Sequence, residues 1–291
     1  MRYYLLIFVV IIFGAANNSF SATIDKSYVS PFQGTYDKAE NYWLENIGSK
    51  PNNNTRSSIL YFLGNVTNTM FHEFGHALIS EFEIPVLGRE EDAVDSFANI
   101  MMISEDPDPI LDEMIVAVSD EYFEEGKFSE LVAWDEHSMN EQRAYAVVCM
   151  LVGADPVGFK HAADNANMPK DRQEACAFEW GKTSVSWNKL LEEHYLSAKE
   201  KHAPRIIVQY QKPEEKYIKV AGLLEASGII EDVAEYIGVT YKIPNDIIVS
   251  VKRCGEENAF WEPDNHKLTM CYELVDKYLA SATSTQSTSN K

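Results

Sequence analysis

Apolar residues along the chain recur mainly at the three- and four-residue spacing of amphipathic helices. This spacing predicts one helix within the apolar run at 57–82, and further helices at 89–103, 109–125, 140–151, 156–165, 169–194, 220–237 and 272–280. Shorter runs of Ile, Val and aromatic residues predict strands at 206–210, 246–251, 258–261 and 268–271, the last two forming a hairpin. The pattern therefore predicts an α+β fold that is predominantly helical, with a small β-hairpin and edge-strand subdomain.

The ends of these segments carry their own signals. Asn65 and Thr67 are candidate caps for the helix that follows them, and Pro85 is expected to stop it. Gly238 is expected to end the helix at 220–237.

A change of composition near residue 200 predicts two regions. Residues 199–204 lack apolar spacing, so we expect a helical region at 22–200 and an α/β region at 201–280. Residues 281–291 are nearly all Ser, Thr, Asn and Gln and are expected to form a disordered tail.

The first residues have the pattern of a secretory signal peptide. A positive start is followed by an apolar run from Leu5 to Phe13, too short to span a bilayer, and by the small residues Ser21 and Ala22. We expect residues 1–21 to be removed, since an uncleaved anchor needs a longer apolar run. The mature chain should be secreted or periplasmic, with no membrane span.

Charge excludes two classes of partner. The chain has 45 acidic and 25 basic residues, a net charge of -20, so nucleic acid and anionic membrane surfaces would repel it.

Four cysteines fit an oxidising compartment, where an even number favours two disulfides. Three pairings are possible, and we favour Cys149 with Cys176 and Cys254 with Cys271 because each pair brackets a locally coherent segment. A zinc site made of four cysteines is disfavoured because the sequence contains no Cys-x-x-Cys spacing.

Residues 71–78 read Phe-His-Glu-Phe-Gly-His-Ala-Leu and carry the main candidate chemistry. His72 and His76 are four residues apart, so on a helix they share a face and can bind one zinc ion. Glu73 is then placed to act on a water at the metal. Gly75 lowers helix stability, which suggests that another backbone or a substrate passes close to it. Two surface histidines on an amphipathic helix are the alternative.

A third ligand must come from a neighbouring element, and the nearest acids are Glu90, Glu91, Asp92 and Asp95. Glu91 and Asp95 are four residues apart and share a helix face. We predict that Glu91 binds the metal while Asp95 accepts the free N–H of a ligating histidine. The alternative is that these acids only stabilise the start of a helix.

His137 is a candidate for stabilising the oxyanion of a tetrahedral intermediate, with Asp135 or Glu136 orienting its ring. A capping or surface histidine is the alternative. Tyr145 is a weaker candidate for the same role, because a tyrosine in this position is more often part of a core.

The motifs at 72–76 and 91–95 resemble the zinc-binding pattern of gluzincin-type metallopeptidases. The longer strings at 72–79 and 85–93, with segments in 135–143 and 254–274, resemble the DUF4344 family, which is described as metallopeptidase-like. This resemblance implies a zincin-like fold, a zinc cofactor and a peptide or protein substrate.

The same resemblance makes Asn258 and Ala259 candidates for substrate binding, since residues 258–261 look like the edge strand that holds an extended peptide in gluzincins. That strand normally precedes the zinc helix, whereas here it follows it. A plain structural hairpin is the alternative.

Together these observations predict an exported zinc metallopeptidase with His72, His76 and Glu91 as ligands, Glu73 as general base and His137 as an assisting group. One alternative is a non-catalytic zinc protein that binds a peptide or a cell-wall component. Another is hydrolysis of a non-peptide amide, because the same chemistry serves any amide.

Overall fold

The computed structural model describes residues 29–48, 53–104, 107–128, 132, 134–197 and 205–288. The predicted signal peptide lies outside this part of the chain. The α-helices in this part of the chain are α1 (Gln33–Asn46), α2 (Asn53–Glu81), α3 (Glu90–Met102), α4 (Pro109–Gly126), α5 (Asn140–Ala154), α6 (Lys160–Asn165), α7 (Lys170–Leu191), α8 (Ile218–Ser227), α9 (Ile229–Thr240) and α10 (Tyr272–Thr288).

Four strands form a single sheet whose spatial order is β1 (Ile206–Tyr210), β2 (Ile247–Lys252), β4 (Lys267–Cys271) and β3 (Ala259–Glu262). Strands β1, β2 and β4 are parallel, and β3 pairs antiparallel with β4 at the edge. Side chains of β2 are fully buried at Ile247, Val249 and Val251, which explains its unbroken apolar run. The predicted hairpin and the predominantly helical α+β class are confirmed.

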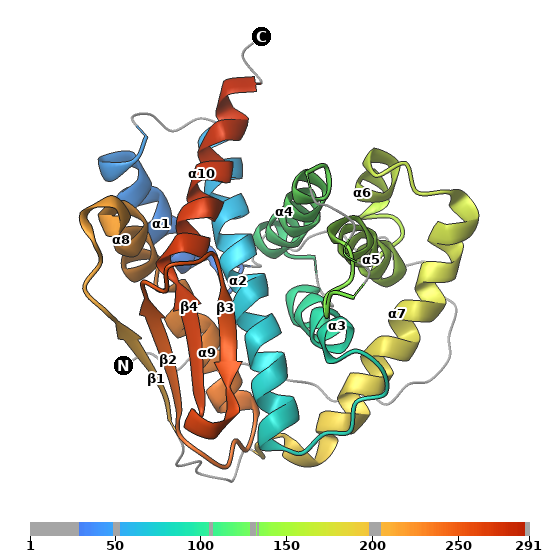
Figure 1. The fold of residues 1–291 in the computed structure, drawn as a ribbon. Helices are drawn as coiled ribbons and strands as arrows, with labels where there is room; N and C mark the ends of the chain where they lie inside the picture. The colour runs from blue at the N-terminus through green and yellow to red at the C-terminus, as the bar shows by residue number, and fades with distance from the viewer. Residues whose placement is uncertain are drawn as a thin grey trace.

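Helix α2 runs through the middle of the molecule (Figure 1). The sheet with α1, α8, α9 and α10 lies on one side of it, and α3 to α7 lie on the other. Because α2 is covered on both sides, it is apolar around most of its circumference. Its fully or almost fully buried side chains are Ile59, Leu60, Phe62, Leu63, Val66, Met70, Phe74, Ala77 and Leu78. The helix that carries the histidine motif is therefore a rigid, central frame.

The two predicted regions share a hydrophobic core. Phe71 of α2 meets Tyr236 of α9 edge to face, with ring centroids 6.0 Å apart; Phe71 belongs to a buried cluster against which the partly buried Tyr236 packs. The division of the chain near residue 200 stays a prediction.

Helix α2 begins at Asn53, so Asn65 and Thr67 are not caps, and that prediction was wrong. Both lie in the interior of the helix and satisfy their polar groups on its own backbone: Asn65 donates to Tyr61 O at 3.0 Å and Thr67 donates to Leu63 O at 2.7 Å. Helix α1 was also not predicted, because its sequence is polar apart from scattered aromatic residues such as Trp43.

The helix expected at 220–237 is two helices. The chain breaks at Gly228, whose φ of 73° is in the left-handed region, while Gly238 lies inside α9 and does not end it. Helix α10 continues through Thr288, so residues 281–288 are helical rather than disordered. Ala282 is buried in the core, and Ser58 of α2 donates to its carbonyl at 2.6 Å, which helps to extend α10.

The favoured cysteine pairing is confirmed. Cys149 of α5 is bonded to Cys176 of α7, and Cys254 is bonded to Cys271 at the end of β4. Each disulfide joins elements that are near in sequence, as the spacing suggested.

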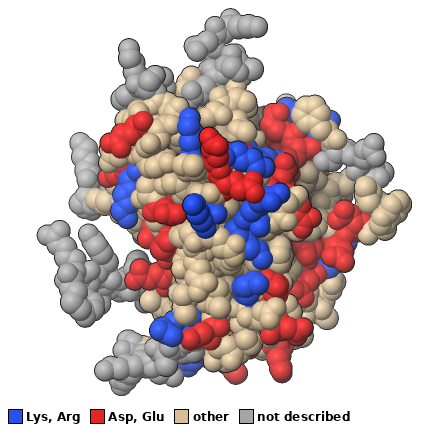
Figure 2. All heavy atoms as spheres, turned by 60° about the vertical axis from the view of Figure 1, so that its left-hand side comes forward, with Lys and Arg blue, Asp and Glu red and all other residues tan. Residues whose placement is uncertain are grey.

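Two further features concern the surface. On the face shown in Figure 2, acidic and basic side chains are intermingled, so the negative net charge is not gathered there into one patch. Within the described ranges, no helix combines the length and the apolar character that crossing a bilayer requires.

Candidate metal centre

His72 and His76 lie one turn apart on the same face of α2, with ring centroids 5.0 Å apart. His72 is buried, with 7% of its surface exposed, and His76 is partly exposed. The sequence spacing therefore places the two imidazoles side by side, as predicted for this motif.

A reversal of the chain after α2 packs α3 against the face that carries the histidines. Glu83 and Gly88 in this turn have φ values of 52° and 118°. A Cβ atom added to Gly75 would lie 2.9 Å from two atoms of the Val94 side chain on α3, so α2 and α3 approach closely at this point. The neighbour at Gly75 is thus a side chain of the next helix rather than the backbone or substrate expected there, and the close approach places the first turn of α3 beside the histidines.

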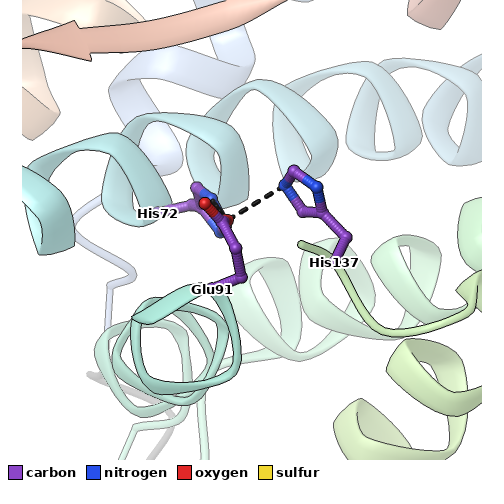
Figure 3. Close-up of side chains that lie close together, drawn as sticks. All are labelled: His72, Glu91 and His137. Atoms are coloured by element: carbon purple, nitrogen blue, oxygen red, sulfur yellow. Dashed lines mark ion pairs between the residues drawn. The ribbon is translucent and has the colours of Figure 1, made fainter. Parts of the chain in front are cut away.

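The Glu91 carboxylate in that first turn faces three imidazoles. Its Oε2 atom lies 3.2 Å from Nε2 of His72 and 2.9 Å from Nε2 of His137, and its Oε1 atom lies 3.5 Å from Nε2 of His76. Figure 3 shows the Glu91 carboxylate against the His72 ring, with His137 pointing toward it from the other element. We call Glu91, His72, His76 and His137 the histidine–glutamate cluster.

The cluster favours positive charge at its centre. Burial raises the pKa of Glu91, but the close imidazoles of His137, His72 and His76 outweigh burial and hold that pKa well below its usual range. The buried Oε2 atom of Glu91 nevertheless has no hydrogen bond of good geometry within the described part of the chain. A carboxylate oxygen in this state is suited to binding a cation.

Carboxylates behind the rings set the tautomer of two histidines. Nδ1 of His72 donates to Asp95 Oδ1 at 2.8 Å, and Nδ1 of His76 donates to Glu90 Oε1 at 2.8 Å. In the neutral imidazole, each Nε2 then carries a lone pair directed at Glu91. Lone pairs on nitrogen and oxygen repel one another unless a proton or a metal ion lies between them.

The raised pKa of His72 also shows that the cluster favours positive charge. Burial lowers it, but hydrogen bonds to Asp95 and Glu91 outweigh burial and raise the pKa to about 9. Imidazole nitrogens and a carboxylate oxygen are the donor set of catalytic zinc sites. The residues present therefore fit a divalent metal ion.

Glu73 is buried next to the cluster, with 5% of its surface exposed. Burial raises the pKa of Glu73, while the charges of His72 and His76 act to lower it. Its carboxyl group is therefore within electrostatic reach of the two histidines, on the same helix.

His137 reaches the cluster from the loop before α5. Its backbone N–H donates to Asp135 Oδ1 at 2.9 Å, and its Nδ1 atom lies 3.5 Å from the same oxygen, so Asp135 is the neighbouring acid that faces it. The next residue, Ser138, donates to Asp92 Oδ1 at 2.6 Å, which ties this loop to α3. Ligand atoms of His72, Glu91 and His137 all lie within 4.8 Å of one another.

Asp95 accepts from His72 as expected, and it also accepts from Arg143 of α5. Burial raises the pKa of Asp95, but the charge of Arg143 and the bond to His72 hold it well below its usual range. Arg143 has no role predicted from sequence, because an isolated arginine in an amphipathic helix carries no recognisable pattern.

The remaining candidates lie elsewhere. Asn258 precedes edge strand β3, its carbonyl accepts from Cys271 N at 3.0 Å, and its side chain lies near Glu256 rather than the cluster. Ala259 pairs with Met270 in the β3–β4 ladder. The hydroxyl of Tyr145 donates to Ala166 O at 3.1 Å, so it is engaged away from the cluster.

A comparison with protein families matches residues 32–191 and 210–291 to DUF4344, whose description is "Putative metallopeptidase". The chain belongs to this family. No curated protein and no solved structure matches it. The DUF4344 match spans α1 to α7 and most of the α/β region, and it includes all four residues of the histidine–glutamate cluster. Membership in a metallopeptidase family implies a metal ion, and His72, Glu91 and His137 form a group whose ligand atoms lie close enough together to hold one.

Proposed function

We propose that this chain is an exported zinc-dependent metallopeptidase that hydrolyses peptide bonds. The observation that carries the proposal is the Glu91 carboxylate, which faces Nε2 of His72, His76 and His137 while Glu73 is buried on the same helix. The family match supports peptidase chemistry at a coarser level.

In this proposal His72, His76 and Glu91 hold one zinc ion. The Nδ1 bonds to Asp95 and Glu90 keep both Nε2 lone pairs directed at the ion. Zinc supplies Lewis acidity, which makes water a stronger nucleophile and polarises a carbonyl group.

Glu73 acts as the general base. It accepts a proton from the water that attacks the peptide carbonyl and then donates this proton to the leaving amine. Its raised pKa, caused by burial, suits this role because the group must both accept and release a proton near neutral pH. Glu73 makes no contribution to metal binding in this assignment, so its presence argues for catalysis rather than for simple metal storage.

His137 donates a hydrogen bond to the carbonyl oxygen as negative charge develops on it, and Asp135 orients the ring. Asn258 and Ala259 hold the substrate backbone beside β3, an edge strand with one unpaired side in the sheet order. Figure 1 places β3 beside α2, the helix that carries His72 and His76.

Export is part of the proposal because two disulfides fit an oxidising compartment. The apolar run at 5–13, with its positive start, is the proposed signal.

The test compares wild-type protein with Glu73→Gln, using Glu124→Gln, at an exposed position of α4, as the matched control. We expect Glu73→Gln to keep zinc and to lose hydrolysis of a mixed peptide library by at least about 100-fold. The control should cleave like the wild type, and a chelator should stop cleavage.

Two outcomes would change the assignment. Zinc binding with no cleavage of any peptide by the wild type would favour a non-catalytic binding protein. Cleavage of cell-wall amides but not of peptides would keep the chemistry and change the substrate class.

A further inference from the structure

Asp95, whose carboxylate orients His72, is itself held by an arginine from another helix. Arg143 of α5 donates from Nε to Asp95 Oδ2 at 2.7 Å, and its second nitrogen donates to Oδ1 at 2.6 Å. The guanidinium thus binds both carboxylate oxygens in the paired geometry that fixes a carboxylate plane.

Oδ1 of Asp95, which accepts one of the two hydrogen bonds from Arg143, also accepts from His72 Nδ1 at 2.8 Å. Three donors therefore determine the orientation of one carboxylate, and one of them is the imidazole that faces Glu91. A rotation of Asp95 would break this set of bonds and release the ring of His72.

Arg143 is itself held in place. Its side chain is 14% exposed and that of Asp95 is 15% exposed, so neither group is freely solvated. The guanidinium carbon lies 4.3 Å from the centre of the Tyr122 ring on α4, which leaves the arginine packed between α4 and α3.

We propose that Arg143 is a positioning residue of the metal centre, which acts through Asp95 to hold the His72 ring in its metal-binding orientation. This inference rests on the proposed function, because it assigns His72 to the metal. It extends the centre to a third helix, since α2 carries His72, α3 carries Asp95 and α5 carries Arg143. A lysine at this position would keep the charge but could not bind both oxygens with one planar group.

Another arginine in the chain provides a matched control. Arg56 of α2 lies 5.1 Å from the centre of the Tyr36 ring and donates to Glu113 of α4 at 2.9 Å. It therefore also joins two helices through a carboxylate and an aromatic ring, but it contacts no residue of the histidine–glutamate cluster in the described structure.

The experiment measures the zinc dissociation constant by competition with a chromogenic chelator in the Glu73→Gln background, together with the absorption spectrum of the cobalt-loaded protein. We expect Arg143→Ala to weaken zinc binding about 10-fold or more and Arg143→Lys to weaken it by a smaller factor. Both should change the cobalt spectrum, while Arg56→Ala should leave affinity and spectrum unchanged.

A double-mutant cycle separates positioning from a general structural role. In the Asp95→Asn background, adding Arg143→Ala should weaken zinc binding by less than about twofold. The reason is that Arg143 acts on His72 through the Asp95 carboxylate, which this background already lacks. If Arg143→Ala does not fold, the same comparison is made with Arg143→Lys.

Unchanged zinc affinity in the folded Arg143 variant would overturn the inference, as would an equal loss with and without Asp95. These results differ from failure of the proposed function, in which the parent Glu73→Gln protein would bind no zinc or the wild type would bind zinc and cleave no peptide.

Discussion

Nε2 of His137 lies 2.9 Å from Oε2 of Glu91, although one residue belongs to the loop before α5 and the other to the first turn of α3. This distance is shorter than the 3.5 Å between Nε2 of His76 and Oε1 of the same glutamate. His76 and His137 both lie close to Glu91, so each is a candidate for the second histidine ligand of the proposed metal site.

In the proposed mechanism His76 binds the metal and His137 stabilises the oxyanion, so His76→Ala and His137→Ala should have different effects on zinc affinity and on kcat. We expect His76→Ala to weaken zinc binding by at least about 100-fold, because a direct ligand is lost. His137→Ala should lower kcat by about 100-fold and change zinc affinity only slightly. Metal titration and steady-state kinetics measure the two effects. Loss of zinc in His137→Ala, with zinc retained in His76→Ala, would reverse the assignment.

Substitution of Glu91 and substitution of Glu90 should also have different effects on zinc affinity. Glu91 faces three imidazoles, whereas Glu90 accepts only from the far side of the His76 ring. We therefore expect Glu91→Ala to abolish tight zinc binding and Glu90→Ala to weaken it about 10-fold. Chelator competition at one pH gives both values. Equal losses would mean that the ligand is not Glu91.

Stability of the metal-free protein should fall as pH rises above 6.5. The folded-state pKa of His72 is about 9 and its usual value is 6.5, so its contribution is fully present below pH 6.5 and is lost as pH approaches 9. The loss is at most about 3 kcal/mol in the free energy of unfolding. Urea denaturation at pH 6.5 and pH 9, with and without chelator, measures it.

Zinc should remove this pH dependence, because the metal replaces the proton between His72 and Glu91. A metal-free protein that gains stability between pH 6.5 and pH 9 would contradict the arrangement of charges described above.

Gly75→Ala tests the packing that sets α3 against α2. The added methyl group would lie 2.9 Å from Val94, so we expect a loss of about 1–3 kcal/mol in stability and weaker zinc binding as Glu91 moves away from His72. Gly181→Ala on α7 is the control, since nothing lies within 4 Å of its added Cβ, and it should stabilise the protein by about 0.5–1 kcal/mol. Adding Val94→Ala should recover part of the lost zinc affinity. Thermal unfolding and metal titration measure the effects of both substitutions. Equal effects of Gly75→Ala and Gly181→Ala on stability and zinc binding would exclude this role for Gly75.

Local sequence was sufficient for features that depend on neighbours along the chain. The four-residue spacing of His72 and His76 places them on one helix face whatever the rest of the fold does. Alternation and strand-forming residues predicted the β3–β4 hairpin, and short sequence separations favoured the observed disulfides.

Local sequence failed where a boundary depends on packing. Helix α2 starts well before its expected caps, because burial against two layers stabilises its first turns. The break between α8 and α9 falls at Gly228, where only the path of the backbone requires a positive φ.

The surroundings of the histidines were decided by tertiary structure. By sequence, Glu91 and Asp95 stood out as a pair on one helix face and Glu90 had no assigned role, yet in the structure Glu91, Glu90 and Asp95 each face a different side of the imidazoles. This division depends on how α3 is turned against α2, which the contact between Gly75 and Val94 sets. Arg143 approaches from α5, and no periodic pattern in one helix encodes a contact with another, because such contacts depend on the angle and distance between helices.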